Sequence, residues 1–217
     1  MKVEKQLIEY IEKELQQPLP GEDAQYRMAP DYRKRFNREE ILASNPKISA
    51  VMLLLYPNNN ELNLVFTQRW QYAGVHSGQM SFPGGKKDDA DTDLIETAYR
   101  ETLEEIGVEP AQIRMIGKLS ELYIPPSHFL VYPIVGYAQY APAFKPQVAE
   151  VEKVVEIPLS FFLDKNNINT NTEIKLFNDT VVHVPAYIYN GHIIWGATAI
   201  MLSEFTVILE NALNKFG

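Results

Sequence analysis

Cysteine is absent from this 217-residue sequence, and positive charge is scarce. Twenty lysines and arginines stand against 28 aspartates and glutamates, giving a formal net charge of −8 at pH 7. Without cysteine the chain forms no disulfide framework, no thiolate metal site and no cysteine nucleophile. This absence fits a reducing compartment, so we expect a cytoplasmic location. The acidic balance and the lack of a basic run argue against nucleic acid as a partner.

Long hydrophobic runs are also missing. The run at residues 51–55 is too short to cross a bilayer, and the charged N-terminal stretch does not resemble a signal peptide. We therefore expect no membrane partner. The composition, 46% hydrophobic and 22% charged, is typical of a globular protein. A chain of this length buries roughly 70% of its extended surface on folding, which is enough for a stable core without covalent staples.

The first 45 residues are predicted to form an N-terminal helix and an extended arm, followed by one domain over residues 46–217. Apolar residues recur at helical spacing at the start of the chain, at Val3, Leu7, Ile8, Ile11 and Leu15. We expect this helix to pack on its own domain. A partner-binding helix, including a homodimer contact, is the alternative. Frequent prolines in residues 18–46 indicate an extended arm, with a short helix near residues 39–43.

The remaining pattern mixes many strands with few helices, which predicts an α+β fold. Strands are expected from residue 47, at 61–70 and 113–119, from 129 and 151, at 173–178 and 181–189, and from 192. Turns are expected at residues 57–60, at Asn178-Asp179 and at Asn190-Gly191, of which the last has the sequence of a type I′ hairpin. A helix is expected over residues 197–214.

A central helix is predicted over residues 93–106. Asp93 and Glu96 fit a capping box at its start, and Gly107 fits a left-handed C-cap. The side chains expected to form its buried face lie within roughly 80° of one another and are Ile95, Tyr99, Leu103 and Ile106. Three glutamates lie on the opposite side, at positions 101, 104 and 105.

The three glutamates carry charges of one sign on one helix face. Such pairs repel by a few tenths of a kcal/mol each, about 0.2–0.5, and most acidic helix faces are simply solvated. Gly84 and Gly85 precede this helix, however, and glycine lets backbone approach an ion closely. Hard divalent cations take several oxygen ligands from carboxylates and carbonyls. The combination favours a metal site over a solvated patch.

These residues carry a family resemblance. Gly85, five residues, Asp91, eight residues, and then RETLEEIGV from Arg100 to Val108 resemble the Nudix box of the Nudix hydrolases. That box is glycine, five residues, Glu, seven residues and Arg-Glu-U-x-Glu-Glu-x-Gly-U, where U is a bulky aliphatic residue. The sequence departs at Asp91, at the eight-residue spacing and at Thr102. The resemblance spans about residues 47–205 and implies a Nudix fold, a mixed β-sheet sandwiched between α-helices.

Residues before the box resemble the coenzyme A pyrophosphatase subgroup. Its signature, Leu-Leu-Thr-x-Arg-Ser, three residues, Arg, three residues, Gly, three residues and Phe-Pro-Gly-Gly, matches the spacing from Thr67 to Gly85. Trp70 replaces the Ser, and Gly74 replaces the second Arg. Residues 124–136 and 194–199 also resemble this subgroup.

The resemblance implies a metal-dependent hydrolase that cleaves the diphosphate linkage of a nucleoside diphosphate derivative. Our leading hypothesis is coenzyme A or acyl-coenzyme A, giving phosphopantetheine and adenosine 3′,5′-bisphosphate. The alternatives are another derivative, such as ADP-ribose or a dinucleotide, and a non-catalytic nucleotide-binding sensor. In each case the partner is a small nucleotide derivative.

The resemblance also assigns roles to residues. It implies Mg²⁺ or Mn²⁺ as cofactor, with metal ligands from the Gly85 carbonyl and from Glu101, Glu104 and Glu105. Arg100 is expected to orient a glutamate, with a direct phosphate contact as the alternative. The catalytic set is therefore Arg100, Glu101, Glu104 and Glu105. The substrate-binding candidates are Arg69, Lys86 and Ser127.

Some roles stay open. The general base is a box glutamate or an acid of a later loop, for which Glu150 and Glu152 are candidates, although a surface role is favoured for both. Trp195 is interpreted as a core residue, with stacking on an adenine as the alternative. The histidines at 76, 183 and 192 have no metal-like spacing.

Overall fold

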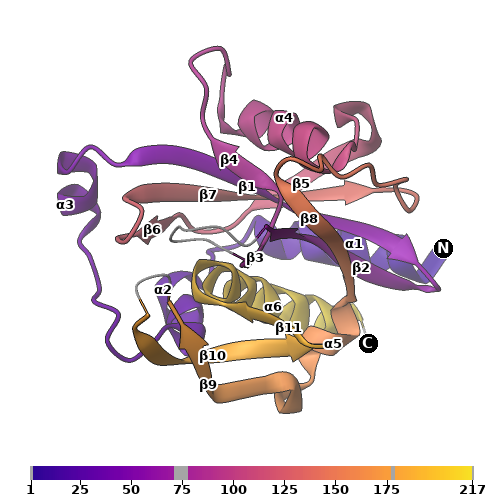
Figure 1. Ribbon diagram of the computed structural model, residues 1–217. Helices are drawn as coiled ribbons and strands as arrows, with labels where there is room; N and C mark the ends of the chain where they lie inside the picture. Colours follow the sequence, from indigo (N-terminus) through magenta and orange to yellow (C-terminus); the bar gives the residue numbers. More distant parts are fainter. Residues whose placement is uncertain (1, 71–77, 177–178, 217) are drawn as a thin grey trace.

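The computed structural model describes residues 2–70, 78–176 and 179–216. A large sheet lies between helix α4 on one face and helices α1 and α6 on the other, and a smaller sheet covers the far side of α6 (Figure 1). This arrangement confirms the α+β prediction of a mixed sheet sandwiched between helices.

The large sheet has eight strands, and its central pair is parallel. Strand β1 (Lys47–Asn58) pairs in parallel with β7 (Phe129–Ala138) and antiparallel with β2 (Glu61–Arg69). The main order is β3-β2-β1-β7-β5; β4 pairs with β1, β6 with β7 and β8 with β2. The remaining strands are β3 (Met80–Ser81), β4 (Gly84–Lys86), β5 (Ile113–Lys118), β6 (Leu122–Ile124) and β8 (Val151–Pro158).

Residues 50–56 of strand β1 are all hydrophobic, as expected where both faces of a sheet are covered. Leu53 and Leu55 belong to the core that contains α6, whereas Met52 and Leu54 belong to the core under α4. All four side chains are fully buried. The alternation of successive side chains along a strand thus supplies two separate cores from one apolar run.

Two hairpins form at turns that the sequence predicted. Between β1 and β2, Asn59 and Asn60 have φ of 51° and 65°, and between β10 and β11, Asn190 and Gly191 have φ of 48° and 83°. Positive φ at both central residues is the requirement of a type I′ turn, which asparagine and glycine tolerate. The expected turn at Asn178-Asp179 falls partly outside the described residues.

The second layer combines helices with a three-stranded antiparallel sheet of β9 (Ile168–Lys175), β10 (Val181–Tyr189) and β11 (His192–Trp195). Helix α1 (Lys2–Leu15) packs on α6 (Gly196–Phe216), and its Ile8 and Ile11 enter the same core. Helix α6 is long and apolar enough to cross a membrane by length and composition, but 61% of the apolar window is buried. We interpret α6 as the core helix of this fold.

Short elements complete the chain. The arm contains α2 (Gly21–Gln25), the 3-10 turn η1 (Tyr26–Met28) and α3 (Arg38–Ala43), the last close to the expected short helix. Helix α5 (Leu159–Leu163) and the 3-10 turn η3 (Lys165–Asn167) connect β8 to β9, and the 3-10 turn η2 (Pro110–Gln112) connects α4 to β5.

Helix α4 (Leu94–Ile106) begins and ends where its caps predict. Asp93 accepts hydrogen bonds from the backbone N–H of Ile95 and Glu96, both at 2.8 Å, and Gly107 ends the helix with φ 71°. The capping box is altered, because the Glu96 carboxylate accepts from the backbone N–H of Thr92 instead of that of Asp93.

The predicted buried face of α4 is confirmed in part, because Ile106 is buried and Ile95 and Tyr99 pack against the same core, whereas Leu103 does not. Ile95, Tyr99 and Leu103 are only half-buried, whereas the buried residues are Thr97, Ala98, Thr102, Glu105 and Ile106. Ala98 and Thr102 are small, and the Thr102 hydroxyl donates to the Ala98 carbonyl at 2.6 Å. The helix therefore packs on β1 with its small residues, and this rotation carries Glu105 inward.

Candidate active site

The diglycine segment forms strand β4 and lies directly under α4. Gly85 pairs with Ala50 of β1. A Cβ atom on Gly85 would lie 2.5–2.6 Å from the carboxylate of Glu101, and one on Gly84, whose φ is 154°, would lie 2.4 Å from the Ala50 carbonyl oxygen. Gly84 therefore requires glycine, because backbone atoms of β1 leave no room for a Cβ, whereas a Cβ on Gly85 would push the Glu101 carboxylate aside.

Glu105 is the most buried of the three box glutamates, with 4% of its surface exposed. Its Oε2 accepts a 3.4 Å hydrogen bond from Thr67 Oγ1, and Arg69 Nη2 lies 3.7 Å from its Oε1. Burial raises the pKa of Glu105 to about 7; the Arg69 charge opposes this increase and the Glu101 charge adds to it. The Glu105 carboxylate is thus poorly solvated, and Arg69 neutralises its charge only in part.

Glu101 lies one turn earlier and is also largely buried. Burial raises its pKa, the hydrogen bond and charge of Arg100 lower it, and the negative charge of Glu104 raises it further. Arg100 Nη1 donates to Glu101 Oε1 at 2.8 Å and to Glu104 Oε2 at 3.0 Å. Glu104 itself is exposed, so the guanidinium links an inner carboxylate to an outer one.

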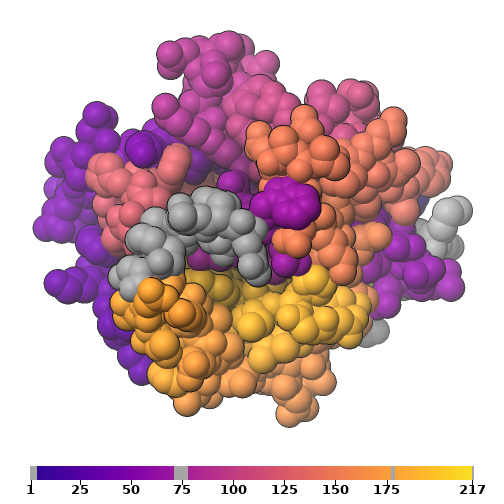
Figure 2. Space-filling view, in the orientation of Figure 1, coloured from indigo at the N-terminus to yellow at the C-terminus, as the bar shows by residue number. Residues whose placement is uncertain are grey.

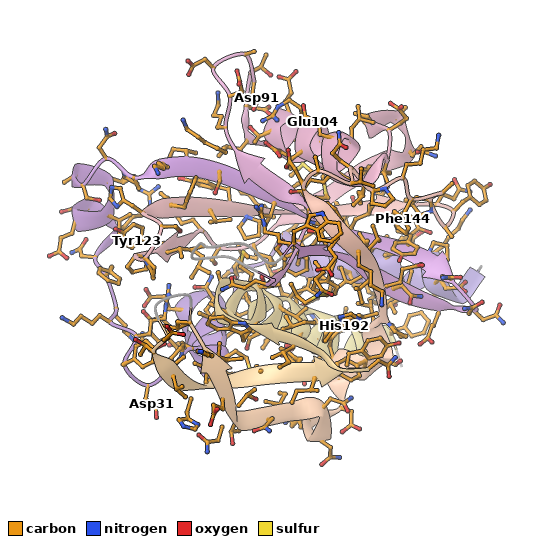
Figure 3. All side chains as sticks on the ribbon, in the orientation of Figure 1. Asp31, Asp91, Glu104, Tyr123, Phe144 and His192 are labelled. Carbon is orange, nitrogen blue, oxygen red and sulfur yellow. The ribbon has the colours of Figure 1, made fainter. Side chains whose placement is uncertain are left out.

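Asp91, the residue that departs from the box pattern, anchors Arg100. Arg100 Nε and Nη2 donate to the two Asp91 oxygens at 2.9 and 3.0 Å. Thr97 Oγ1 and the backbone N–H of Asp88 also donate to Asp91, at 2.8 and 2.9 Å. Asp91 and Glu104 lie near each other at the top of the fold (Figure 3). The hydrogen bonds from Arg100 hold the pKa of Asp91 well below its usual range.

Two of the box carboxylates suit a divalent cation better than the third. Glu101 and Glu105 supply two desolvated carboxylates on successive turns. Burial and, to a smaller extent, neighbouring negative charges raise both pKa values, and a cation would stabilise the charged forms against both effects. Within the part of the chain that the structure describes, no three acidic or histidine side chains form a preformed metal cluster. Arg100 occupies one oxygen each of Glu101 and Glu104. The fit is therefore best for Glu101 and Glu105, beside Gly85.

A cavity of about 650 Å³ opens beside the diglycine segment. It lies between the large sheet and the layer of α6 and β11, and the arm contributes to its wall. Figure 2 shows one face of the molecule, with α4 at the top and the β9–β11 layer with α6 at the bottom. The predicted substrate residues Arg69, Lys86 and Ser127 all line this cavity.

Trp195 also lines the cavity and is half-buried, so the interpretation of this residue as part of the core is wrong. The turn of β11 into α6 at Gly196 presents the indole at the cavity wall. Sequence reasoning missed a further group of lining residues, which lie in the arm: Pro30, Tyr32, Arg33, Lys34 and Phe36. No motif marks them, because their approach to the site depends on how the arm packs.

The candidates for the general base and the histidines differ in how exposed they are. Glu150 is exposed, but its charge contributes to the raised pKa of both Glu101 and Glu105, so it lies near the carboxylates. Glu152 is exposed on β8. His183 is exposed on β10 and His192 is half-buried on β11, whereas His76 and Gly74 fall outside the described residues.

Comparisons with known proteins agree with this geometry. The model of the NUDIX domain matches residues 46–169. The chain is 32% identical to the human mitochondrial coenzyme A diphosphatase NUDT8 over 77% of this chain and 71% of that protein. It is 37% identical to the peroxisomal coenzyme A diphosphatase NUDT7 of Mus musculus over 58% of this chain and 52% of that protein. The matches thus span 52% to 71% of the length of these curated relatives.

A solved structure supports the fold. The crystal structure of the Nudix hydrolase RenU from M. smegmatis aligns with a TM-score of 0.50, at 12% identity, over 86% of this chain and 94% of that one. The box residues, the diglycine strand, the domain match and these relatives all lead to one assignment: the chain belongs to the Nudix hydrolase family.

Proposed function

We propose that this chain is a metal-dependent hydrolase that cleaves the diphosphate linkage of coenzyme A or an acyl-coenzyme A. The products are phosphopantetheine, acylated in the second case, and adenosine 3′,5′-bisphosphate. The observation that carries the proposal is the position of two desolvated carboxylates, Glu101 and Glu105, against a diglycine strand that borders a cavity with cationic walls. Two relatives named as coenzyme A diphosphatases support the choice of substrate.

Glu101 and Glu105 would hold Mg²⁺ or Mn²⁺, with Glu104 and the Gly85 carbonyl as further ligands. A bound divalent ion supplies charge neutralisation at phosphate oxygens and lowers the pKa of its water. Arg100, fixed by two hydrogen bonds to Asp91, sets the positions of Glu101 and Glu104.

Substrate binding falls to the cavity. Its volume of about 650 Å³ lies within the range of about 300–1,000 Å³ that is usual for small-molecule sites. Lys86 lies on the diglycine strand and Arg69 lies on β2 beside Glu105, and both would contact diphosphate oxygens from the cavity wall. Ser127 lies in the loop between β6 and β7, and its Oγ is buried without a hydrogen-bond partner. Apolar residues such as Ile200 and Met201 offer a wall for the pantetheine or acyl chain.

The test is a substrate panel with and without divalent metal. We expect hydrolysis of coenzyme A to require Mg²⁺ or Mn²⁺, and its kcat/KM to exceed those of ADP-ribose and reduced nicotinamide dinucleotide. Glu101→Gln should lower turnover by at least about a hundredfold, in line with the loss of one strong electrostatic contact. Glu173→Gln removes an exposed carboxylate on β9 and is the matched control.

Three outcomes would contradict this proposal in different ways. A preference for ADP-ribose or the dinucleotide would overturn the substrate assignment alone. Ligand binding without phosphate release, with metal present, would indicate a nucleotide sensor. Near-normal turnover of Glu101→Gln would overturn the metal assignment.

Other properties remain proposals. We keep the division into residues 1–45 and 46–217, although α1 shares a core with the domain. The homodimer stays a prediction. The cytoplasmic location also stays a prediction, and the two relatives are named as mitochondrial and peroxisomal proteins.

A further inference from the structure

The charged residues that line the cavity come in two groups. Lys86 lies on the diglycine strand and Arg69 on β2, whereas Arg33 and Lys34 belong to the arm. Among the lining residues that the structure describes, none is acidic, although the whole chain has a formal charge of −8. Positive charge is thus concentrated at this cavity, on two elements far apart in the sequence.

The arm is held in place at both of its ends. Glu204 of α6 is fully buried and accepts a 3.0 Å hydrogen bond from the backbone N–H of Gly21. Further along, Arg33 Nη2 donates to the Tyr123 carbonyl at 2.6 Å, and the Phe36 ring packs edge-on against that of Tyr123 at 5.2 Å. Tyr123 lies on β6, next to the arm (Figure 3). The segment between these contacts is therefore a fixed wall of the cavity.

Two of the four cations in the segment 33–38 are already neutralised. Arg35 donates to Glu22 at 3.2 Å, and Arg38 is paired with the Glu121 carboxylate. These two residues do not line the cavity. The other two cations line it, and neither forms an ion pair with a carboxylate of the described residues. The arm thus directs its unneutralised charge into the cavity.

Two polar atoms in the wall have no partner. Arg33 Nε and Ser127 Oγ are both buried and form no hydrogen bond within the described chain. A buried donor without an acceptor is unfavourable, and such groups are rare in folded proteins. Arg33 and Ser127 both line the cavity, so a ligand with several acceptor oxygens would satisfy them after a small shift of the side chains that now cover the two atoms. Guanidinium groups suit phosphate in particular, because the fork of donors matches its oxygens.

We propose that Arg33, Lys34 and Ser127 form a second anion subsite, which binds a phosphomonoester that the substrate carries away from its diphosphate. The inference rests on the proposed function, in which Arg69 and Lys86 receive the diphosphate. Coenzyme A has one such group, the 3′-phosphate of its ribose, whereas ADP-ribose has none. The subsite therefore selects 3′-phosphorylated substrates.

Binding tests the subsite without turnover. Calorimetry on the full chain compares adenosine 3′,5′-bisphosphate with adenosine 5′-monophosphate, which differ only in the 3′-phosphate. The wild type should bind the bisphosphate about 10- to 100-fold more tightly, the range expected for charge-assisted hydrogen bonds. In the double variant Arg33→Gln/Lys34→Gln this preference should fall to about threefold or less.

Hydrolysis supplies the second measurement, with coenzyme A and its 3′-dephospho form as the substrate pair. The double variant should lose about tenfold or more in kcat/KM for coenzyme A and little for the dephospho form. Arg33 also donates to the Tyr123 carbonyl, so its loss could disturb the structure. A purely structural defect would lower kcat/KM equally for both substrates. Arg35→Gln, which removes a neighbouring but neutralised cation, is the control and should leave the ratio unchanged.

The outcomes separate the subsite from the activity. Equal affinity of the wild type for the two nucleotides would overturn the subsite while the hydrolase proposal stands. An unchanged ratio of kcat/KM for coenzyme A to kcat/KM for its dephospho form in the double variant would do the same. A retained binding preference without hydrolysis of either coenzyme would support the subsite and overturn the activity.

Discussion

Replacing Glu105 with Gln should stabilise the metal-free protein at alkaline pH while it removes activity. Burial raises the pKa of Glu105 from an ordinary value of 4.5 to about 7. The folded state therefore disfavours the charged carboxylate. A carboxyl whose pKa is raised on folding adds no penalty at a pH below the unfolded pKa; its penalty grows between the unfolded and the folded pKa and is constant above the folded pKa.

The size of the effect follows from that shift. A rise from 4.5 to about 7 corresponds to about 3 kcal/mol once the carboxylate is fully ionised in both states. The amide of Gln keeps the volume and still accepts the hydrogen bond from Thr67. We therefore expect the free energy of unfolding of the variant to exceed that of the wild type by about 2–3 kcal/mol at about pH 9 and by little at about pH 4. For a chain of this size the alkaline gain is a Tm increase of about 4–12 °C.

Urea unfolding across this pH range, with chelator present, measures the difference between the two proteins. Titrating groups that do not interact with Glu105 cancel, because they are common to both; Glu101, which does interact with it, makes a smaller contribution. Added Mg²⁺ or Mn²⁺ should then stabilise the wild type and leave the variant nearly unchanged, since ligand binding to the folded state raises its stability. A difference that does not vary with pH, or a variant that is less stable at alkaline pH, would refute the burial argument. Glu173→Gln is the matched control, with an expected effect within about 0.5 kcal/mol.

Two further substitutions test how the site is built. Gly85→Ala places a Cβ 2.5–2.6 Å from the Glu101 carboxylate, so it should lower kcat by about a hundredfold, as measured by steady-state kinetics with retained circular dichroism. Asp91→Asn loses the charge that anchors Arg100 and should cost about 1–3 kcal/mol near neutral pH. Because the folded pKa of Asp91 is depressed, its stabilisation exists above the unfolded value and is lost as pH falls. Urea unfolding should therefore show the deficit shrinking in acid, and a deficit that grew there would contradict this reasoning.

Much of the fold was predictable because its signals are local. Asp93 caps α4 and Gly107 ends it, since these side chains and backbone angles depend on the nearest few residues. Asn190-Gly191 forms its hairpin for the same reason. The box spacing likewise placed Arg100 and the glutamates on one helix, where positions three and four apart are neighbours.

The rotation of α4 was not predictable from its periodicity. A hydrophobic pattern shows which residues are apolar, but it does not reveal which of them the neighbouring strand can accommodate. Close packing on β1 selected the small residues Ala98 and Thr102 and left Tyr99 half-buried. The same packing buried Glu105, and its raised pKa is a property of that environment.

The sequence by itself determined the elements, the caps and the acidic helix beside a diglycine strand, because these follow from contacts within a few residues. Only the tertiary structure decided which charges share a cavity. The arm reaches that cavity through Glu204, Tyr123 and the Arg33 guanidinium. Those contacts join residues about 90 or more positions apart. Such distances in sequence carry no local pattern, so the cationic wall that the arm adds to the cavity emerged only on folding.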